Sequence, residues 1–400
     1  MRIVHIEDFF HPWSGYQVNI LSKYQAKMGN TVTVITSKPD KLPDTLKEFF
    51  NFNNIEEIDN EFYDNYKVKV IRINLYAHLS GRSIYYEKVF KLVDDLKPDI
   101  LYVHGNDTYI GIRYILKSNK LKYPVITDNH MVEMASENRF RKIFRFAYRH
   151  LITRKIVKNK IPVIRMSNDN FVQLNYNIPK RLTPTISFGS DLMLFHPDQK
   201  LKYDMRRYLN VPLDSFIILY AGKLDESKGG MFFAEAIRDK IVSSKEILFV
   251  IIGNFIGDYG ARVKSIINLS ENRVICFPTQ KYADLAKYYN MADVAVFPKQ
   301  CSLSFYDVQA CGLPVLLEDN DINKQRISFN NGLLFKSNDK DDFILKLSEL
   351  IEMPKDNFNE MKQKSIKYIT RNYNYEEVCQ KYMDIIYKQI SDFRKLKAKL

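Results

Sequence analysis

The sequence predicts an α/β protein with two successive parallel sheets, and two observations support this prediction. Short apolar runs alternate with helical patterns along the 400 residues, an order that builds parallel sheets with right-handed crossovers. The alternation pauses after Pro197, at the polar run 198–204, and then begins again. We therefore expect two Rossmann-like, doubly wound domains facing a cleft, with ligands at the carboxyl ends of the strands.

The clearest local signal lies in residues 212–230, PLDSFIILYAGKLDESKGG. The apolar run Phe216–Ala221 is long enough for a buried strand, and the helical pattern Met231–Asp239 follows the glycine loop. Strand, glycine loop and helix together point backbone N–H groups at an anion. Lys223 and Lys228 add positive charge, so a diphosphate is the expected guest. An ordinary loop with solvated lysines is the alternative.

The first half of the chain predicts a βαβ unit and further parallel strands. Gly15 lies between the strand Arg2–Ile6 and the helical pattern Tyr16–Met28, at the edge where ligands bind; a plain turn glycine is the alternative. Further strands are expected at Thr31–Thr36, Lys67–Leu75, Asp99–Val103, Val125–Thr127, Pro162–Met166 and Thr183–Ser187. The polar residues 37–66 predict a long loop or insertion.

Two histidines follow predicted strands. His104 comes directly after Asp99–Val103, and His130 comes shortly after Val125–Thr127. Both are therefore expected at the ligand edge of the sheet. A single histidine is more often a core residue than a catalytic one, but two at equivalent strand ends favour a site.

Residues 139–160 contain nine Arg or Lys residues and no acid. Apolar residues that include Phe140 and Phe144 recur at helical spacing and form one face, while Arg145 and the other cations form the remainder. This composition is typical of a helix on an anionic membrane surface. A helix that packs on its own sheet is the alternative. No RNA-binding motif accompanies the charge, so we expect no nucleic-acid partner.

The overall composition limits the class of protein. No apolar run approaches the length that crosses a bilayer, and the opening residues lack the basic start and long apolar segment of a signal peptide. We therefore expect a cytoplasmic protein, either free or bound peripherally to the inner face of the cytoplasmic membrane. The net charge of +13 favours anionic partners. Four cysteines lack metal-ligand spacing, which indicates reduced thiols and no metal site.

The second half repeats the pattern of the first. Asp307 opens a predicted helix at the ligand edge, where a carboxylate can accept hydroxyl hydrogen bonds from a ribose. A helix N-terminal acid favoured by the helix dipole is the alternative. We place one domain at residues 1–196, a second at 197–374, and a last helix at 375–400 that crosses back to the first domain.

Eight short stretches, taken in their order along the chain, resemble the motifs of a known family. They are MRIVHIEDFFHPWSG, KPDILYVHG, ISFGSDLMLFHP, AGKLDESKGG, MADVAVFP, QACGLPVLLED, NNGLLF and NYNYEEVCQKY. In this order they resemble the retaining GT-B glycosyltransferases of family 4, also called group 1, over nearly the whole chain. The resemblance implies an acceptor-binding domain at 1–196 and a nucleotide-sugar-binding domain at 197–374.

The resemblance also implies roles for single residues. Gly15 lets the first loop approach the donor, and His130 resembles the family histidine that contacts the donor sugar. Lys223 stands where the family usually has arginine, Lys228 matches its lysine, and both would bind the diphosphate. Asp307 stands at the second acid of the paired-glutamate motif, which holds the ribose.

One position departs from the family pattern. Eight residues before Asp307 the family has its first glutamate, whereas this chain has Lys299 and no acid from 299 to 306. Either Ser302 and Ser304 contact the donor in its place, or sugar binding differs, or activity is lost.

The expected function is transfer of a sugar from a nucleotide-sugar donor to an acceptor hydroxyl, with retention and without a metal or other cofactor. If residues 139–160 touch an anionic membrane, with Phe140, Phe144 and Arg145 as contacts, the acceptor is a lipid-linked saccharide, as in surface polysaccharide assembly. A nucleotide-sugar epimerase of the same fold is one alternative. A non-catalytic nucleotide-sugar-binding subunit is the other, because the first acid is missing.

Overall fold

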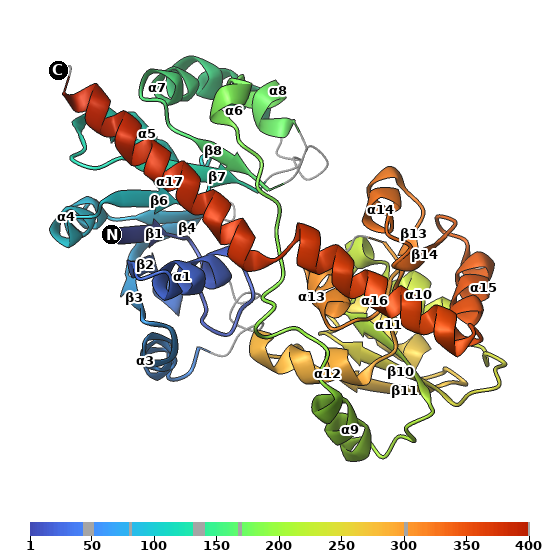
Figure 1. The fold of residues 1–400 in the computed structure, drawn as a ribbon. Coiled ribbons are helices and arrows are strands. Elements are labelled where there is room, and N and C mark those ends of the chain that lie inside the picture. The colour runs from blue at the N-terminus through green and yellow to red at the C-terminus, as the bar shows by residue number, and fades with distance from the viewer. Residues whose placement is uncertain (43–51, 80–81, 131–140, 167–169, 300–302, 399–400) are drawn as a thin grey trace. The chain divides into compact units, whose positions relative to one another are not determined.

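The computed structural model describes residues 1–42, 52–79, 82–130, 141–166, 170–299 and 303–398. The chain divides into two compact units (Figure 1). Unit 1 comprises Met1–Phe188 with Glu376–Leu400, and unit 2 comprises Gly189–Tyr375.

Unit 1 is built on a six-stranded sheet in the order β3-β2-β1-β6-β7-β8, in which all neighbouring strands are parallel. Its strands consist mainly of buried, β-branched and aliphatic residues, as expected where helices cover both faces of a parallel sheet. The strands are β1 (Arg2–Ile6), β2 (Thr31–Ser37), β3 (Val68–Ile73), β6 (Ile100–Val103), β7 (Val125–Asn129) and β8 (Val163–Arg165).

Helices surround this sheet, and an antiparallel hairpin of β4 (Leu75–Leu79) and β5 (Arg82–Tyr85) extends beyond β3. The last helix, α17 (Tyr375–Lys397), packs on unit 1 through Gln389, which donates to the Val125 carbonyl, and through Tyr382, which accepts from Gln17. The other helices are α1 (Gln17–Lys27), α3 (Ile55–Tyr66), α4 (Lys88–Leu96), α5 (Tyr109–Lys117), α6 (Arg141–Ala147), α7 (Thr153–Lys158) and α8 (Phe171–Tyr176).

Unit 2 repeats the architecture with a second parallel sheet in the order β11-β10-β9-β12-β13-β14. Its strands are β9 (Phe216–Ala221), β10 (Ile247–Ile252), β11 (Arg273–Phe277), β12 (Val294–Phe297), β13 (Val315–Glu318) and β14 (Gly332–Phe335). Its helices are α9 (Gln199–Tyr208), α10 (Gly230–Ala236), α11 (Gly257–Ile267), α12 (Leu285–Met291), α13 (Ser304–Ala310), α14 (Asp321–Arg326), α15 (Lys340–Ile351) and α16 (Lys355–Asn372).

Both sheets reverse their strand order at their first strand. In unit 1 the chain runs outward from β1 to β3 and then returns to the other side with β6; in unit 2 it does the same around β9 and β12. Loops leaving the carboxyl ends of the two central strands diverge at such a reversal, which opens a crevice for ligands. Each unit therefore has one preferred place for a site: after β1 and β6, and after β9 and β12.

The prediction of a long loop over residues 37–66 is wrong for residues 55–66. Residues 55–66 form helix α3, whose Ile58 and Phe62 are buried, and Phe62 packs edge-on against Phe10 at 5.6 Å. The four-residue spacing of these two apolar side chains is the helical signal. Five acidic residues in the same segment obscure it. Residues 43–51 lie outside the described part of the chain.

The strand expected at Thr183–Ser187 is also wrong. Only one bridge forms there, between Thr185 and Arg165. Pro184 precedes Thr185 and has no backbone N–H to donate, so the segment cannot continue a ladder on both sides.

Candidate functional site

The loop after β9 follows the predicted strand–loop–helix pattern. Gly222 ends the strand, and a Cβ atom on Gly253 would lie 1.9 Å from the Gly222 carbonyl oxygen, so only glycine fits where the loops after β9 and β10 meet. Gly229 has a φ of +73° at the start of α10, a conformation that glycine adopts without strain. The tight turn places Lys223 and Lys228 at the carboxyl edge of the sheet.

Two N–H groups at the start of α10 already have partners. The Gly230 N–H donates to the Asp225 carbonyl, and the Met231 N–H donates to the Tyr259 hydroxyl at 2.9 Å. The Asp225 side chain also accepts from the Lys228 N–H. Positive charge for a diphosphate must therefore come mainly from lysine side chains rather than from these helix N–H groups.

Lys299 belongs to the same loop cluster. The Cβ position of Gly229 lies 3.2 Å from Lys299 Cγ and 3.2 Å from Pro298 Cβ, so the loops after β9 and β12 touch. The residue at the position of the family's first acid thus lies against the predicted phosphate loop, with the opposite charge. The sequence shows a cation where the family has an acid, but it does not show that this cation meets the loop after β9.

Ser304, the first residue of α13, is also tied to this cluster. Its hydroxyl donates to the Ala221 carbonyl, the last of β9, at 3.1 Å. This bond joins the helix after β12 to the end of β9. Ser302 lies outside the described residues, and donor contacts by either serine stay a prediction.

Asp307 points into unit 2. Asp307 is only 3% exposed. Its Oδ1 accepts from Ser190 Oγ at 2.7 Å and from the Tyr282 hydroxyl at 3.4 Å. Burial, reinforced by the negative charge of Asp191, raises the pKa of Asp307 well above its usual value. The predicted ribose contact stays a prediction, because it needs this carboxyl group to turn toward the sheet edge.

The carboxyl edge of the unit 1 sheet carries a cluster of histidines and acids. His104 follows β6 and His130 follows β7, as the sequence predicted, and the two strands are neighbours. Asp128 of β7 lies between the imidazoles: its Oδ2 is 2.7 Å from His104 Nδ1 and 3.4 Å from His130 Nε2. Its Oδ1 accepts from the Gly105 N–H at 2.7 Å. The sequence analysis missed Asp128, an acid inside an otherwise buried strand.

A buried chain of side chains supports Asp128 from behind. His104 Nε2 lies 3.0 Å from His5 Nδ1, and His5 Nε2 lies 2.7 Å from Gln25 Oε1 on α1. Burial and the neighbouring His104 lower the pKa of His5 to about 3, so His5 is neutral. The chain holds the His104 ring in one orientation, as partners of a functional histidine commonly do.

The charges of the cluster follow from its geometry. Burial disfavours ionisation of Asp128, but the two adjacent imidazoles outweigh it, and the pKa of Asp128 lies below its usual value. Burial also disfavours the charged form of His130, yet the Asp128 carboxylate outweighs this and raises the pKa of His130. An ionised carboxylate only accepts, so His130 Nε2 carries the proton that faces Asp128.

Two further acids follow β1 directly. Burial raises the pKa of Glu7, and burial together with the Glu7 charge raises the pKa of Asp8 to about 7. Glu7 Oε2 lies 3.9 Å from His104 Nδ1. Carboxyl groups with raised pKa values at a sheet edge are typical of functional sites. Gly15 lies farther along the same loop, next to Tyr16, the residue before α1.

His104, Asp128 and His130 each offer one ligand atom within 4.8 Å of the others, which is compact enough for a metal ion. The same atoms also contact one another directly, and these contacts account for their proximity without a metal ion. The expectation that no metal is needed stays a prediction.

Comparison with known proteins assigns this arrangement to a family. Residues 14–158 match the profile described as Glycosyltransferase Family 4, and residues 215–353 match that of Glycosyl transferases group 1. The chain belongs to the group 1, family 4 glycosyltransferases. The two matches cover the loops that carry Gly15, His130, Lys223, Lys228 and Asp307.

Two relatives with assigned names show how far the similarity extends. A galactosyltransferase of Escherichia coli, named UDP-Gal:alpha-D-GlcNAc-diphosphoundecaprenol alpha-1,3-galactosyltransferase, is 26% identical over 270 residues, or 64% of this chain and 67% of the relative. Spore coat protein SA of Bacillus subtilis is 26% identical over 160 residues, or 36% and 42%. The match thus spans less than half the length of the latter relative.

Solved structures resemble the whole chain and confirm the predicted GT-B fold class. A glycosyltransferase from Rickettsia africae has a TM-score of 0.71 at 15% identity, over 97% of this chain and 98% of its own. Anabaena HepE in complex with UDP has a TM-score of 0.71 at 14% identity, over 97% and 100%.

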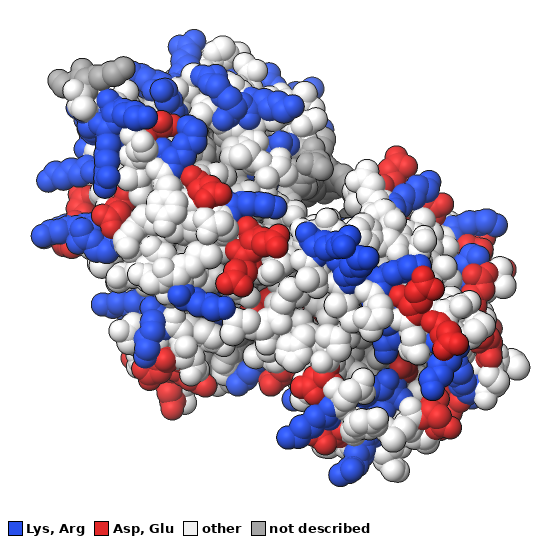
Figure 2. Space-filling view, viewed as in Figure 1, with Lys and Arg blue, Asp and Glu red and all other residues white. Residues whose placement is uncertain are grey.

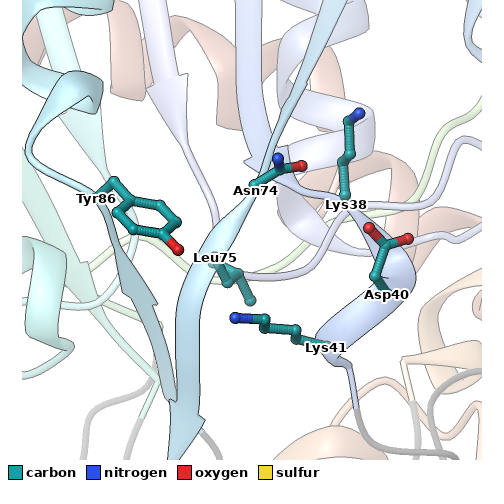
Figure 3. Close-up of a pocket in the computed structure, with 6 residues that line it drawn as sticks. All are labelled: Lys38, Asp40, Lys41, Asn74, Leu75 and Tyr86. Atoms are coloured by element: carbon teal, nitrogen blue, oxygen red, sulfur yellow. The ribbon is translucent and has the colours of Figure 1, made fainter.

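This family 4 chain also has a small hollow at the carboxyl ends of β2 and β3 (Figure 3). Its volume is about 160 Å³. Tyr86, Leu75 and Lys41 converge in it, whereas the Lys38 amine points away (Figure 3). Lys41 donates to the carbonyl of Tyr76, whose exposed ring packs edge-on against Tyr86 at 5.6 Å. An exposed aromatic pair beside polar groups can contact the faces of sugar rings.

The basic segment of this chain differs in detail from the single predicted helix. Helix α6 continues through a π-helical turn, η4 (Tyr148–Ile152), into α7. Tyr148, Ile152 and Ile156 face the core, whereas Ile143, Phe146 and Leu151 are 62–70% exposed. The inserted residue of a π turn shifts the helix face, so the predicted single apolar face divides into a buried and an exposed part.

The predicted membrane contacts fall on both parts of this segment. Phe144 is 40% exposed and packs partly on Tyr176, and the Arg145 guanidinium lies over the Phe171 ring. Phe140 lies outside the described residues. Lys and Arg side chains gather over the part of unit 1 where Figure 1 shows α6, α7 and α8 (Figure 2). None of the described helices is long and apolar enough to span a bilayer.

We expect Asp307→Asn to stabilise unit 2 at neutral pH but not near pH 4. A folded-state pKa above the unfolded one gives stability that is present below the unfolded pKa and is lost as the pH rises toward the folded pKa. The amide has no such cost. Urea unfolding at pH 4 and pH 7 checks this, and a variant less stable than the parent at both pH values would contradict the buried, protonated carboxyl group.

We expect Asp128→Asn to lower the pKa of His130, because the carboxylate that favours the imidazolium is removed while the shape is kept. Ring NMR of isotope-labelled histidines during a pH titration measures this pKa. His150→Gln, in the exposed basic segment, is the matched control and should leave the His130 titration unchanged. An unchanged His130 pKa in Asp128→Asn would show that the contact does not set its charge.

Proposed function

We propose that this protein transfers a sugar from a nucleoside-diphosphate sugar to an acceptor hydroxyl, with retained configuration. The observation that supports this best is the lysine cluster of Lys223, Lys228 and Lys299 on the loops after β9 and β12 of a family 4 chain. A cluster of this kind stabilises the negative charge that develops on a departing diphosphate.

In the proposed reaction the bond between the sugar C1 and the diphosphate oxygen breaks, and its electron pair stays on the diphosphate. The acceptor oxygen forms the new bond to C1 on the same face, and its proton passes to the departing diphosphate. Lysine ammonium groups supply the compensating charge, so we propose that no metal takes part. His130, with Nε2 held by Asp128, is the proposed contact to the transferred sugar.

Uridine is the base we favour for the first assays. Anabaena HepE has been solved with UDP and with UDP-glucose, and the Escherichia coli relative is named for UDP-Gal. These are properties of those proteins, and for this chain they define which nucleotide is tested first.

We further propose a lipid-linked saccharide as acceptor and an anionic membrane as the surface on which it is met. The Escherichia coli relative is named for a diphosphoundecaprenol acceptor. In this chain, Ile143, Phe146 and Leu151 are exposed. They lie in the segment 139–160, which contains nine Arg or Lys residues and no acid. Apolar side chains that enter the acyl boundary beneath basic ones are what interfacial binding needs. Assembly of a surface polysaccharide is the corresponding role.

The epimerase and the binding subunit remain the competing functions. An epimerase interconverts nucleotide sugars without an acceptor, so product analysis without acceptor distinguishes it. A binding subunit is favoured by the loss of the first acid at Lys299, and it would bind the nucleotide without turnover.

We expect UDP to raise the thermal stability of the protein in EDTA as well as in magnesium, by binding only the native state. Lys228→Ala and Lys299→Ala should each weaken UDP binding roughly ten-fold, the effect of losing one charged contact. GDP, ADP and TDP serve as comparison nucleotides. Lys240→Ala, an exposed lysine outside the loop cluster, is the control. If none of the four nucleotides raises the thermal stability, the proposed donor site is rejected.

We expect the protein to sediment with vesicles that contain anionic lipid and to remain free with purely zwitterionic ones. Replacing Ile143, Phe146 and Leu151 together with serine should weaken binding by roughly ten-fold or more, because their apolar surface no longer leaves water. Val242→Ser removes an apolar side chain that is 90% exposed in unit 2 and is the matched control. Equal binding of the triple variant and the parent would reject the membrane surface.

A further inference from the structure

Unit 2 has a second polar hollow, away from the lysine cluster of the donor loops. It has a volume of about 360 Å³ and is lined from α9, α16 and the turns before β12 and β13. Ala292 and Leu313 shortly precede those two strands, so the hollow lies at their amino ends. Lys223 and Lys299 lie at the carboxyl ends of β9 and β12, at the opposite edge. This volume is within the range of small-molecule sites.

Lys362 brings an uncompensated positive charge into this hollow. It is a half-buried residue of α16, and among the described residues no carboxylate oxygen lies within 4.0 Å of its Nζ. Burial and the neighbouring Lys202 lower the pKa of Lys362. A partly buried ammonium group without a partner is costly, and an anion beside it removes that cost.

Two acids bear on this hollow. Asp198 lines it and caps α9, where its Oδ1 accepts from the Leu201 N–H at 3.0 Å. Asp293, whose charge acts on Lys362, is already shared by two other cations. Asp293 Oδ2 accepts from Arg206 Nη2 at 2.6 Å, and its Oδ1 lies 3.3 Å from Lys202 Nζ. Arg206 is fully buried and also donates to three backbone carbonyls, so its pairing is fixed by the fold. Asp293 therefore pairs with Lys202 and Arg206, and among the described residues no carboxylate pairs directly with Lys362.

The other walls of the hollow suit a polar ligand of small size. The carboxamides of Gln199, Asn359 and Gln363 line it and can donate to oxygen atoms. Gly312, at φ +87°, keeps the space open, because a Cβ there would lie 3.3 Å from Ile366 Cδ1 and 3.9 Å from Pro197 Cγ, both in the lining.

We propose that this hollow is an anion site that binds the phosphate group of a small phosphorylated metabolite, with Lys362 as its charge partner. The carboxamides contact the hydroxyl groups of the same ligand. The site is separate from the donor loops, and the proposal does not depend on the transferase activity.

The test measures binding of inorganic phosphate and of glucose 6-phosphate by calorimetry, at constant ionic strength set with chloride. The measurements use the full-length protein carrying Lys228→Ala, which weakens phosphate binding at the donor loops. Lys362→Ala in this background should weaken both ligands roughly ten-fold. Lys364→Ala is the matched control, because it lies on the same helix and pairs with Glu360 at 2.7 Å. It should bind like the parent.

A second variant and an unfolding measurement separate lost binding from lost folding. Gln363→Glu places a negative charge at the hollow and should also abolish binding without removing any cation. Lys362→Ala should unfold at the same temperature as the parent or a higher one, so lost binding cannot be attributed to unfolding. Unchanged phosphate affinity in Lys362→Ala would overturn the site, and binding of inorganic phosphate without glucose 6-phosphate would overturn the metabolite.

Discussion

The reversal of strand order at the first strand of each sheet is the constraint on which the functional features of this protein depend. Parallel strands deliver their carboxyl ends to one edge, and the reversal separates the loops that leave the two central strands there. Glu7, His104 and Asp128 meet at that edge in unit 1, although β7 follows β1 by more than a hundred residues. Lys223 and Lys299 meet in the same way in unit 2.

The two edges differ in their chemistry. In unit 1 the groups are acids and histidines, linked from Gln25 through His5 and His104 to Asp128. In unit 2 they are lysines around glycine turns, while the acid Asp307 is directed into the interior toward Ser190. The first edge can orient hydrogen bonds to a sugar, and the second can neutralise a diphosphate. Their combination suits a sugar transfer better than a hydrolysis with paired carboxylates.

The basic segment shows how packing changes the meaning of a sequence pattern. Its apolar residues have helical spacing, but the π turn η4 directs Tyr148 and Ile152 to the core and leaves Ile143 and Phe146 exposed. Exposed apolar side chains surrounded by cations need an explanation other than core packing, because a solvated basic face requires no phenylalanine or isoleucine. The proposed anionic interface would supply that explanation.

The sequence by itself determined the fold class, both sheets, nearly all of their strands, and the two histidines and two lysines that lie at the sheet edges. It could do so because the period of apolar residues and the glycines of tight turns are local signals. Helix α3 escaped detection since acids obscured its period. Only the tertiary structure decided that Asp128 joins His104 to His130, that Lys299 touches the loop after β9, and that Asp307 is buried. Those facts depend on which strands become neighbours and on the direction in which each side chain leaves its element, and neither is encoded in a local pattern.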